Sequence, residues 1–172
     1  MNGEVTERIA KLIRERLPPE YEVLHDPHSH EKGKDRIVSR VRGERLSYID
    51  LVVVDSSSNE LLMIMEVEES SKEPKRVLGD IFAVLMGDNI TYGRRNEGRE
   101  LKITSQTVMV VAISKIDHRR RDDILEQRVN EARRLLARQF QNSKLGRVII
   151  LPFEDEHELV SELIKLVKKI PC

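Results

Sequence analysis

Two strongly apolar runs, residues 46–55 and 61–68, enclose the short polar segment 56–60 and dominate the hydrophobic pattern of the chain. Runs of this length, rich in Val, Ile and Leu on either side of serine and asparagine, predict two strands of a β-hairpin joined by a polar turn. Both runs also contain acidic residues, which are uncommon among such apolar neighbours. The acidic side chains of the predicted hairpin are therefore the first candidates for a functional site.

The register of this hairpin determines which acids meet. If Asp55 pairs with Leu61, then Asp50 lies opposite Glu66. The same register predicts two apolar pairs, Val54 with Leu62 and Val52 with Ile64. Opposed residues share one face of the sheet, with Cβ atoms about 5 Å apart. Glu68 lies two residues beyond Glu66, so it adds a third acid to the same face.

The remaining apolar pattern predicts an α/β fold. Helical spacing appears in four segments, which are residues 5–17, 74–86, 122–140 and 159–170. Further strands are predicted over residues 21–24, 36–41, 107–114 and 148–152, with loops over 25–34 and 89–102. The order α, β, β, β, α, β, α, β, α implies a mixed central sheet flanked by helices on both faces.

Composition narrows the class of protein. A chain of 172 residues predicts one domain, residues 1–172. The 30 basic and 30 acidic residues cancel, so net charge provides no general attraction to nucleic acid or membranes. The single cysteine, Cys172, and the lack of any apolar run of membrane length predict a cytoplasmic protein. The charged fraction of 35% is typical of a thermophile source.

Electrostatics suggests a role for the acidic row. Two carboxylates about 5 Å apart repel each other, and burial beside valines makes their ionisation more costly. A bound divalent cation would remove this penalty, so Asp50, Glu66 and Glu68 are predicted metal ligands. The alternative is that these acids lie at a sheet edge in water, or pair with nearby arginines.

With the acidic hairpin after a first helix, and a helix and a strand after the hairpin, the chain resembles the PD-(D/E)xK nuclease superfamily, also called restriction-endonuclease-like. The resemblance covers about residues 5–114 and implies an αβββαβ core that cleaves DNA with magnesium. By motif, Asp50 corresponds to the aspartate of the family and Glu66 to its (D/E) position. Glu68 stands where lysine is usual, as in the minority of restriction enzymes with Asp…Glu-x-Glu.

The resemblance implies a role for each site residue. Asp50 and Glu66 are expected to hold Mg²⁺, or Mn²⁺ as a substitute, with help from the carbonyl of Val67. Glu68 would hold a second ion or accept a proton from the attacking water. The first candidate for the missing positive charge is Lys75, which is predicted to face the sheet in one helical row with Leu78 and Phe82. The alternative is that Lys75 is a solvated lysine in the first turn of its helix. Lys72 is the second candidate.

The predicted function is that of a Mg²⁺-dependent endodeoxyribonuclease. Aromatic residues make up only 3% of the chain, which favours duplex or branched DNA over stacked single strands. A homodimer is expected, because cutting both strands takes two sites. The alternative is a catalytically inactive module that binds DNA or a protein partner with the same fold. A third possibility gives the acids a structural role only.

Three further features have open interpretations. His25, His28 and His30 could ligate a transition metal, or could belong to a flexible polar loop. Basic clusters at residues 94–95 and 119–121 would suit phosphate contact, or could be solvated loops.

Overall fold

The computed structural model describes residues 4–26, 35–68, 74–87, 89–94, 98–114 and 147–170, without the side chains of residues 74–78 and 80. The described helices are α1 (Glu4–Arg16), α2 (Pro74–Met86) and α4 (Glu156–Val167). The described strands are β1 (Tyr21–His25), β2 (Arg36–Val41), β3 (Glu44–Tyr48), β4 (Leu51–Asp55), β5 (Leu61–Glu68), β6 (Asn89–Gly93), β7 (Arg99–Leu101), β8 (Val108–Ser114) and β9 (Arg147–Phe153). The helix predicted over residues 122–140 lies outside the described residues.

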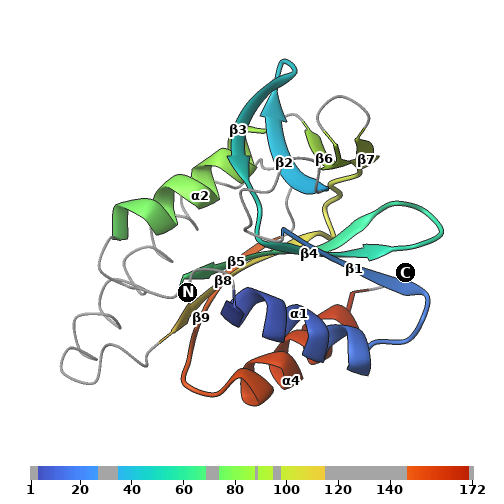
Figure 1. The fold of residues 1–172 in the computed structure, drawn as a ribbon, viewed down its shortest axis with the longest axis vertical. Helices are drawn as coiled ribbons and strands as arrows, with labels where there is room; N and C mark the ends of the chain where they lie inside the picture. The colour runs from blue at the N-terminus through green and yellow to red at the C-terminus, as the bar shows by residue number, and fades with distance from the viewer. Residues whose placement is uncertain are drawn as a thin grey trace.

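A five-stranded mixed sheet forms the centre of the fold, with the order β1-β4-β5-β8-β9. The first three strands pair antiparallel, and β5, β8 and β9 pair parallel. All seven residues of β8 are buried, as expected for a strand covered on both faces. Helices α1 and α4 cover one face (Figure 1). Their apolar residues pack there against Leu51, Val53 and Met65 of the sheet.

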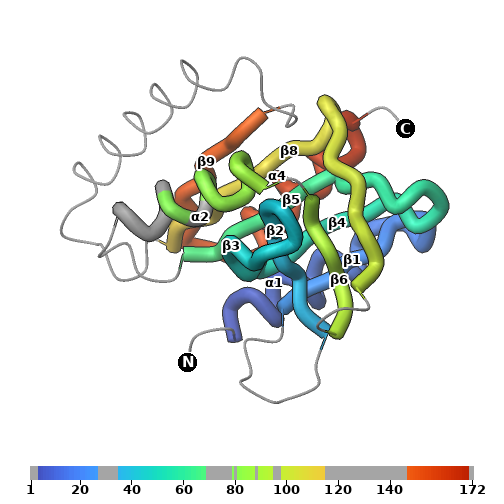
Figure 2. The backbone as a smooth tube through the Cα atoms, turned by 90° about the horizontal axis from the view of Figure 1, so that it is seen from above, coloured from blue at the N-terminus to red at the C-terminus, as the bar shows by residue number. Residues whose placement is uncertain are grey.

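The opposite face is covered by α2 and by a second, antiparallel sheet of order β3-β2-β6-β7 (Figures 1 and 2). Ile81 and Val84 of α2 share a core there with Val52 and Ile64. The predicted mixed sheet with helices on both faces is therefore confirmed. The predicted loop over residues 89–102 is wrong in part, because β6 and β7 lie within it and complete the second sheet.

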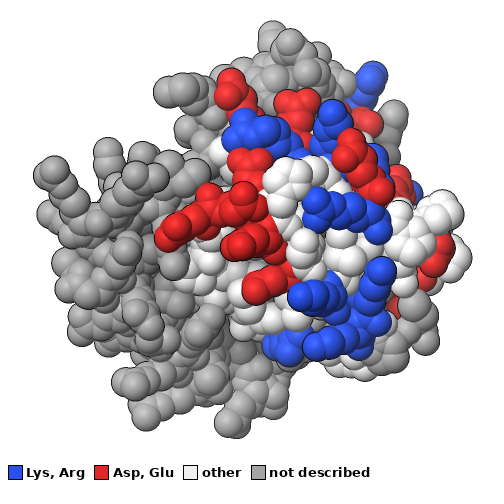
Figure 3. Space-filling view, turned by 90° about the horizontal axis from the view of Figure 1, so that it is seen from below, with Lys and Arg blue, Asp and Glu red and all other residues white. Residues whose placement is uncertain are grey.

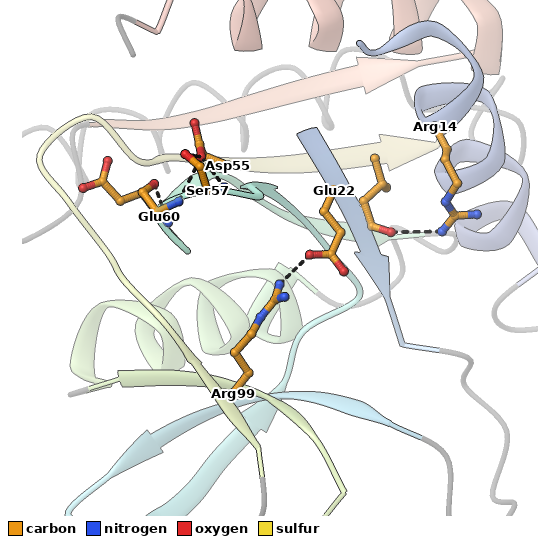
Figure 4. A network of polar contacts seen from close by, with 8 residues as sticks. Arg14, Glu22, Asp55, Ser57, Glu60 and Arg99 are labelled. Atoms are coloured by element: carbon orange, nitrogen blue, oxygen red, sulfur yellow. Dashed lines mark hydrogen bonds and ion pairs between the residues drawn. The ribbon is translucent and has the colours of Figure 1, made fainter. Parts of the chain in front are cut away.

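Ion pairs and hydrogen bonds join the two sheets. Arg99 of β7 donates to Glu22 of β1 over 2.7 Å, so a strand of the second sheet is tied to the edge of the first (Figure 4). Arg14 of α1 donates to the carbonyl of Val23 on the other side of β1.

None of the described helices is long and apolar enough to cross a membrane.

The predicted hairpin register is correct along the strands and wrong at the turn. Val52 pairs with Ile64, as predicted. Beyond Val53 a β-bulge shifts the register, so Val54 pairs with Leu61 rather than with Leu62. The Asp55 N–H correspondingly donates to Glu60 O, one residue before Leu61, the predicted partner of Asp55. The bulge leaves the half of the hairpin that carries Asp50 in the predicted register.

The turn itself is organised by the Asp55 side chain. Its Oδ1 atom accepts hydrogen bonds from Ser57 Oγ (2.6 Å), Ser57 N (2.8 Å) and Ser58 N (3.1 Å) (Figure 4). The side-chain bond from Ser57, followed by its backbone bond, holds the pKa of Asp55 below the ordinary value of 3.8. The carboxylate is thus more stable in the folded protein than in the unfolded chain.

We expect Asp55→Ala to lower the melting temperature at neutral pH, because the turn loses three acceptor contacts. A carboxyl group whose pKa is lower in the folded protein than in the unfolded chain stabilises the fold at pH values above its unfolded pKa. This contribution is lost as the pH falls through the folded pKa. The difference in melting temperature between wild type and variant should therefore shrink below about pH 3.8. Thermal melts followed by circular dichroism at several pH values measure this. A difference of constant size down to the acid end would contradict the assignment.

Candidate acidic site

Asp50 lies where the chain passes from one sheet to the other. The sequence pattern predicted a single strand over residues 46–55, but β3 ends at Tyr48 in the second sheet and β4 begins at Leu51 in the first. The buried Ile49 is held at this junction by its N–H, which donates to Ile37 O over 3.0 Å. Asp50 is therefore placed at a backbone transition, with strands of both sheets around it.

The two predicted acids come together across β4 and β5. Continuing the pair Leu51 with Met65 by one residue places Asp50 opposite Glu66. The Val67 N–H donates to Asp50 Oδ2 over 2.7 Å, which holds the Asp50 carboxylate against β5. The predicted proximity of Asp50 to β5 at Glu66 is thus confirmed.

The acidic row faces the side of the sheet that carries α2 and the second sheet. Strand residues two apart share a face, and Val52 and Ile64 belong to the core on that side. Glu66 and Glu68 are each only 7% exposed. Both glutamates are therefore removed from bulk water, unlike acids at an open sheet edge.

A fourth acid, Asp26, extends this row on the other side of Asp50. His25 of β1 pairs with Leu51, and the Asp26 N–H donates to Asp50 O over 2.8 Å. The side chain of Asp26 is 1% exposed and accepts from Arg36 Nε over 2.6 Å. Asp26 could not be found from the sequence, because its place depends on how β1 pairs with β4.

Arg36 brings a positive charge to this row. The β2–β3 register pairs Val38 with Tyr48 and then Ile37 with Ile49, so its continuation places Arg36 opposite Asp50. The Arg36 guanidinium carbon lies 4.0 Å from the centroid of the Tyr48 ring. Arg36 is 27% exposed whereas Asp26 is buried, so the ion pair presents its positive end outwards.

The structure gives no support to the helical row proposed for Lys75. Lys75 lies in the first turn of α2, which covers the acidic face, but its side chain is outside the described residues, as is all of Lys72. Phe82, expected to face the sheet in the same row as Lys75, is 43% exposed. Ile81 and Val84 make the core contact instead. A role for Lys75 stays a prediction.

The described residues contain no group of three His, Cys, Asp or Glu side chains placed to hold a metal ion. Mg²⁺ usually needs fewer protein ligands, since one or two carboxylates with waters suffice. Asp50 and Glu66, with the carbonyl of Val67 beside them, are the donors that fit it by oxygen chemistry. A histidine site for a transition metal finds less support. Of His25, His28 and His30 only His25 is described, and its Nδ1 lies 3.5 Å from Arg14 Nη2.

The predicted basic clusters are only partly described. Arg94 forms a 3.5 Å ion pair with Asp35. Its neighbour Arg95 and the whole cluster 119–121 lie outside the described residues.

Comparison with known protein families, with curated proteins and with solved structures finds no significant match for this chain. The assignment of function therefore depends on the residues of the site and on the arrangement of the elements that carry them.

Proposed function

We propose that the protein is a metal-dependent deoxyribonuclease with a restriction-endonuclease-like core, and that Asp50 and Glu66 form its metal-binding centre. The observation that carries the proposal is the approach of the Asp50 carboxylate to β5, where it accepts from the Val67 N–H beside Glu66. Two carboxylates and a backbone carbonyl among buried strands suit a hard divalent cation.

The arrangement of elements supports this proposal. The sequence α1, β1, β4, β5, α2, β8 has the αβββαβ order of such a core, and β8 lies parallel to β5 after the α2 crossover. Strands β2–β3 and β6–β7 are then two insertions that pair with each other to form the second sheet. The first insertion enters directly before Asp50.

In the proposed reaction the residues of the protein orient the acids, accept a proton and provide a positive charge. Bound Mg²⁺ would activate a water and stabilise the leaving oxygen of a phosphodiester. The bond from Val67 N–H fixes the Asp50 carboxylate in direction. Glu68, on the same face, would accept a proton from the attacking water. Arg36 provides a positive charge near the row, where the usual lysine is replaced by Glu68.

Addition of Mg²⁺ or Mn²⁺ is expected to raise the melting temperature of the wild type. A ligand that binds only the folded state stabilises it by about 2.7 kcal/mol at a concentration 100 times its dissociation constant. Differential scanning fluorimetry with and without metal measures this, with Asp50→Asn as the variant that should lose the response. Equal responses of the two proteins would place the metal elsewhere. No response in the wild type would count against a metal site.

A second candidate is a module that binds DNA, or a protein partner, without cleaving it. The observation that favours it is Glu68, a buried acid where the family carries lysine. DNA binding that weakens with salt, without cleavage under Mg²⁺ or Mn²⁺, would support this candidate over the nuclease.

For the nuclease we propose a homodimer, since two sites are needed to cut both strands.

A further inference from the structure

The β2–β3 hairpin, residues 36–48, concentrates positive charge in a chain whose total charge is zero. It contains four arginines and one acidic residue, Glu44. The four arginines are Arg36, Arg40, Arg42 and Arg45. A local basic stripe on a neutral protein indicates a surface for an anionic partner.

The hairpin projects from the body of the protein on the side away from α1 and α4 (Figure 1). Its outer strand, β3, is an edge of the second sheet, and four of its five residues are exposed. Gly43 and Arg42 form the tip with positive φ angles of 81° and 49°. The parts of the hairpin that a duplex would contact are this exposed strand and the tip, because β2 is paired on its other side with β6.

Two of the arginines are ordered by one aromatic ring. The guanidinium carbons of Arg36 and Arg45 lie 4.0 and 4.7 Å from the centroid of the Tyr48 ring. Arg45 also donates to the Tyr48 hydroxyl. Arg36 also contacts the buried Asp26 at 2.6 Å, so the exposed Arg45 is the member of this pair that faces solvent. Stacking on an aromatic ring leaves the edge of a guanidinium available to bind phosphate oxygens.

The hairpin leads directly into the acidic site. Tyr48 precedes Asp50 by two residues, and Arg36 lies opposite Asp50 in the continued β2–β3 register. A polyanion held by the hairpin would therefore meet the acidic row at Asp50, which is half-buried, whereas the other acids of the row are buried. The far side of the molecule differs, since acidic and basic side chains both gather on the face of α1 and α4 (Figure 3). Two of the basic residues there, Arg8 and Lys11, form ion pairs with Glu156 and Glu15.

We infer that the β2–β3 hairpin is the DNA-contacting surface of the protein, with Arg42 and Arg45 binding backbone phosphates of a duplex and Arg36 guiding the strand towards Asp50. The choice of DNA as the partner rests on the proposed nuclease function. The hairpin supplies affinity through phosphate contacts, and the acidic row lies at its base.

The test measures binding separately from cleavage. Fluorescence anisotropy of a short labelled duplex in EDTA, between about 50 and 200 mM NaCl, gives the affinity and its salt dependence. Arg42→Gln/Arg45→Gln is expected to weaken binding about tenfold or more and to lower the slope of log K against log salt by about two. Lys11→Gln/Lys165→Gln removes the same charge from the exposed face of α1 and α4, and should leave the slope unchanged.

A gain in affinity provides a test that misfolding cannot imitate. Glu44 is exposed beside the tip of the hairpin, so Glu44→Gln removes an acid that repels phosphate and should tighten binding severalfold. Equal effects of the hairpin and α1/α4 variants, or no gain from Glu44→Gln, would overturn the inference. Duplex DNA that binds through the hairpin but is never cleaved would leave the inference standing and refute the nuclease. If Asp50→Asn abolishes cleavage but the hairpin variants leave it unaltered, the nuclease proposal stands and the inference about the hairpin is refuted.

Discussion

Asp50→Asn is expected to lower metal-dependent nicking of supercoiled plasmid by at least about 100-fold, since even residues that only support metal ligands cost 10- to 100-fold when lost. Asparagine keeps the size of the side chain and an oxygen that can accept from Val67 N–H. The loss would therefore report the missing negative charge rather than a collapsed strand. Nicking is measured with Mg²⁺ and with Mn²⁺, and Glu66→Gln should behave in the same way.

Glu60→Gln is the matched control for this experiment. Glu60 is an exposed acid at the turn of the same hairpin, on the side of the bulge away from Asp50. Its amide variant should nick plasmid at the wild-type rate. If Asp50→Asn keeps full activity while circular dichroism shows an intact fold, Asp50 is not part of a catalytic centre.

The second large effect is expected on stability. Arg36→Met should lower the free energy of unfolding by about 2–4 kcal/mol, because Asp26 would remain buried without the cation that it contacts at 2.6 Å. The double variant Asp26→Asn/Arg36→Met should recover much of the loss, since removing both charges leaves no buried carboxylate without its cation. Urea unfolding of the wild type, of Asp26→Asn, of Arg36→Met and of the double variant gives a double-mutant cycle for this pair.

Arg8→Met gives the comparison for a surface ion pair. Arg8 contacts Glu156 at 2.7 Å, nearly the same distance, but its side chain is 54% exposed. Exposed pairs contribute about 0–1 kcal/mol, so this variant should be close to wild type in stability. A cost for Arg36→Met no greater than that of Arg8→Met would show that the Asp26–Arg36 pair does not stabilise the junction of the two sheets.

The strands and helices that the sequence alone predicted are those with a clear local pattern of apolar residues. Helix α1 begins and ends within one residue of the predicted 5–17, and the buried strand β8 lies within the predicted 107–114. In α1 the apolar residues repeat with the helical period, and in β8 they form one continuous apolar run, so in both cases neighbouring residues carry enough information. Residues 89–102 lack such a pattern, and their strands form only because β2 is available to pair with β6.

The hairpin turn shows how a long-range contact changes a locally predicted register. Lys102, after β7, accepts from the Leu61 N–H and donates to Asn59 O. Asn59 takes a positive φ of 59°, which asparagine tolerates better than most residues. These bonds produce the bulge at Val54, and nothing in the turn sequence indicates a partner that lies 41 residues further along.

The acidic pair was determined by the sequence itself, because alternation and register in one hairpin were sufficient to bring Asp50 to Glu66. Only the tertiary structure decided what surrounds this pair. Asp26 arrives from β1 and Arg36 from β2, and the two are joined by an ion pair beside Asp50. Their positions depend on pairing between strands distant in the sequence, which no local pattern encodes. The sequence therefore determined the acids, and the fold decided which charges accompany them.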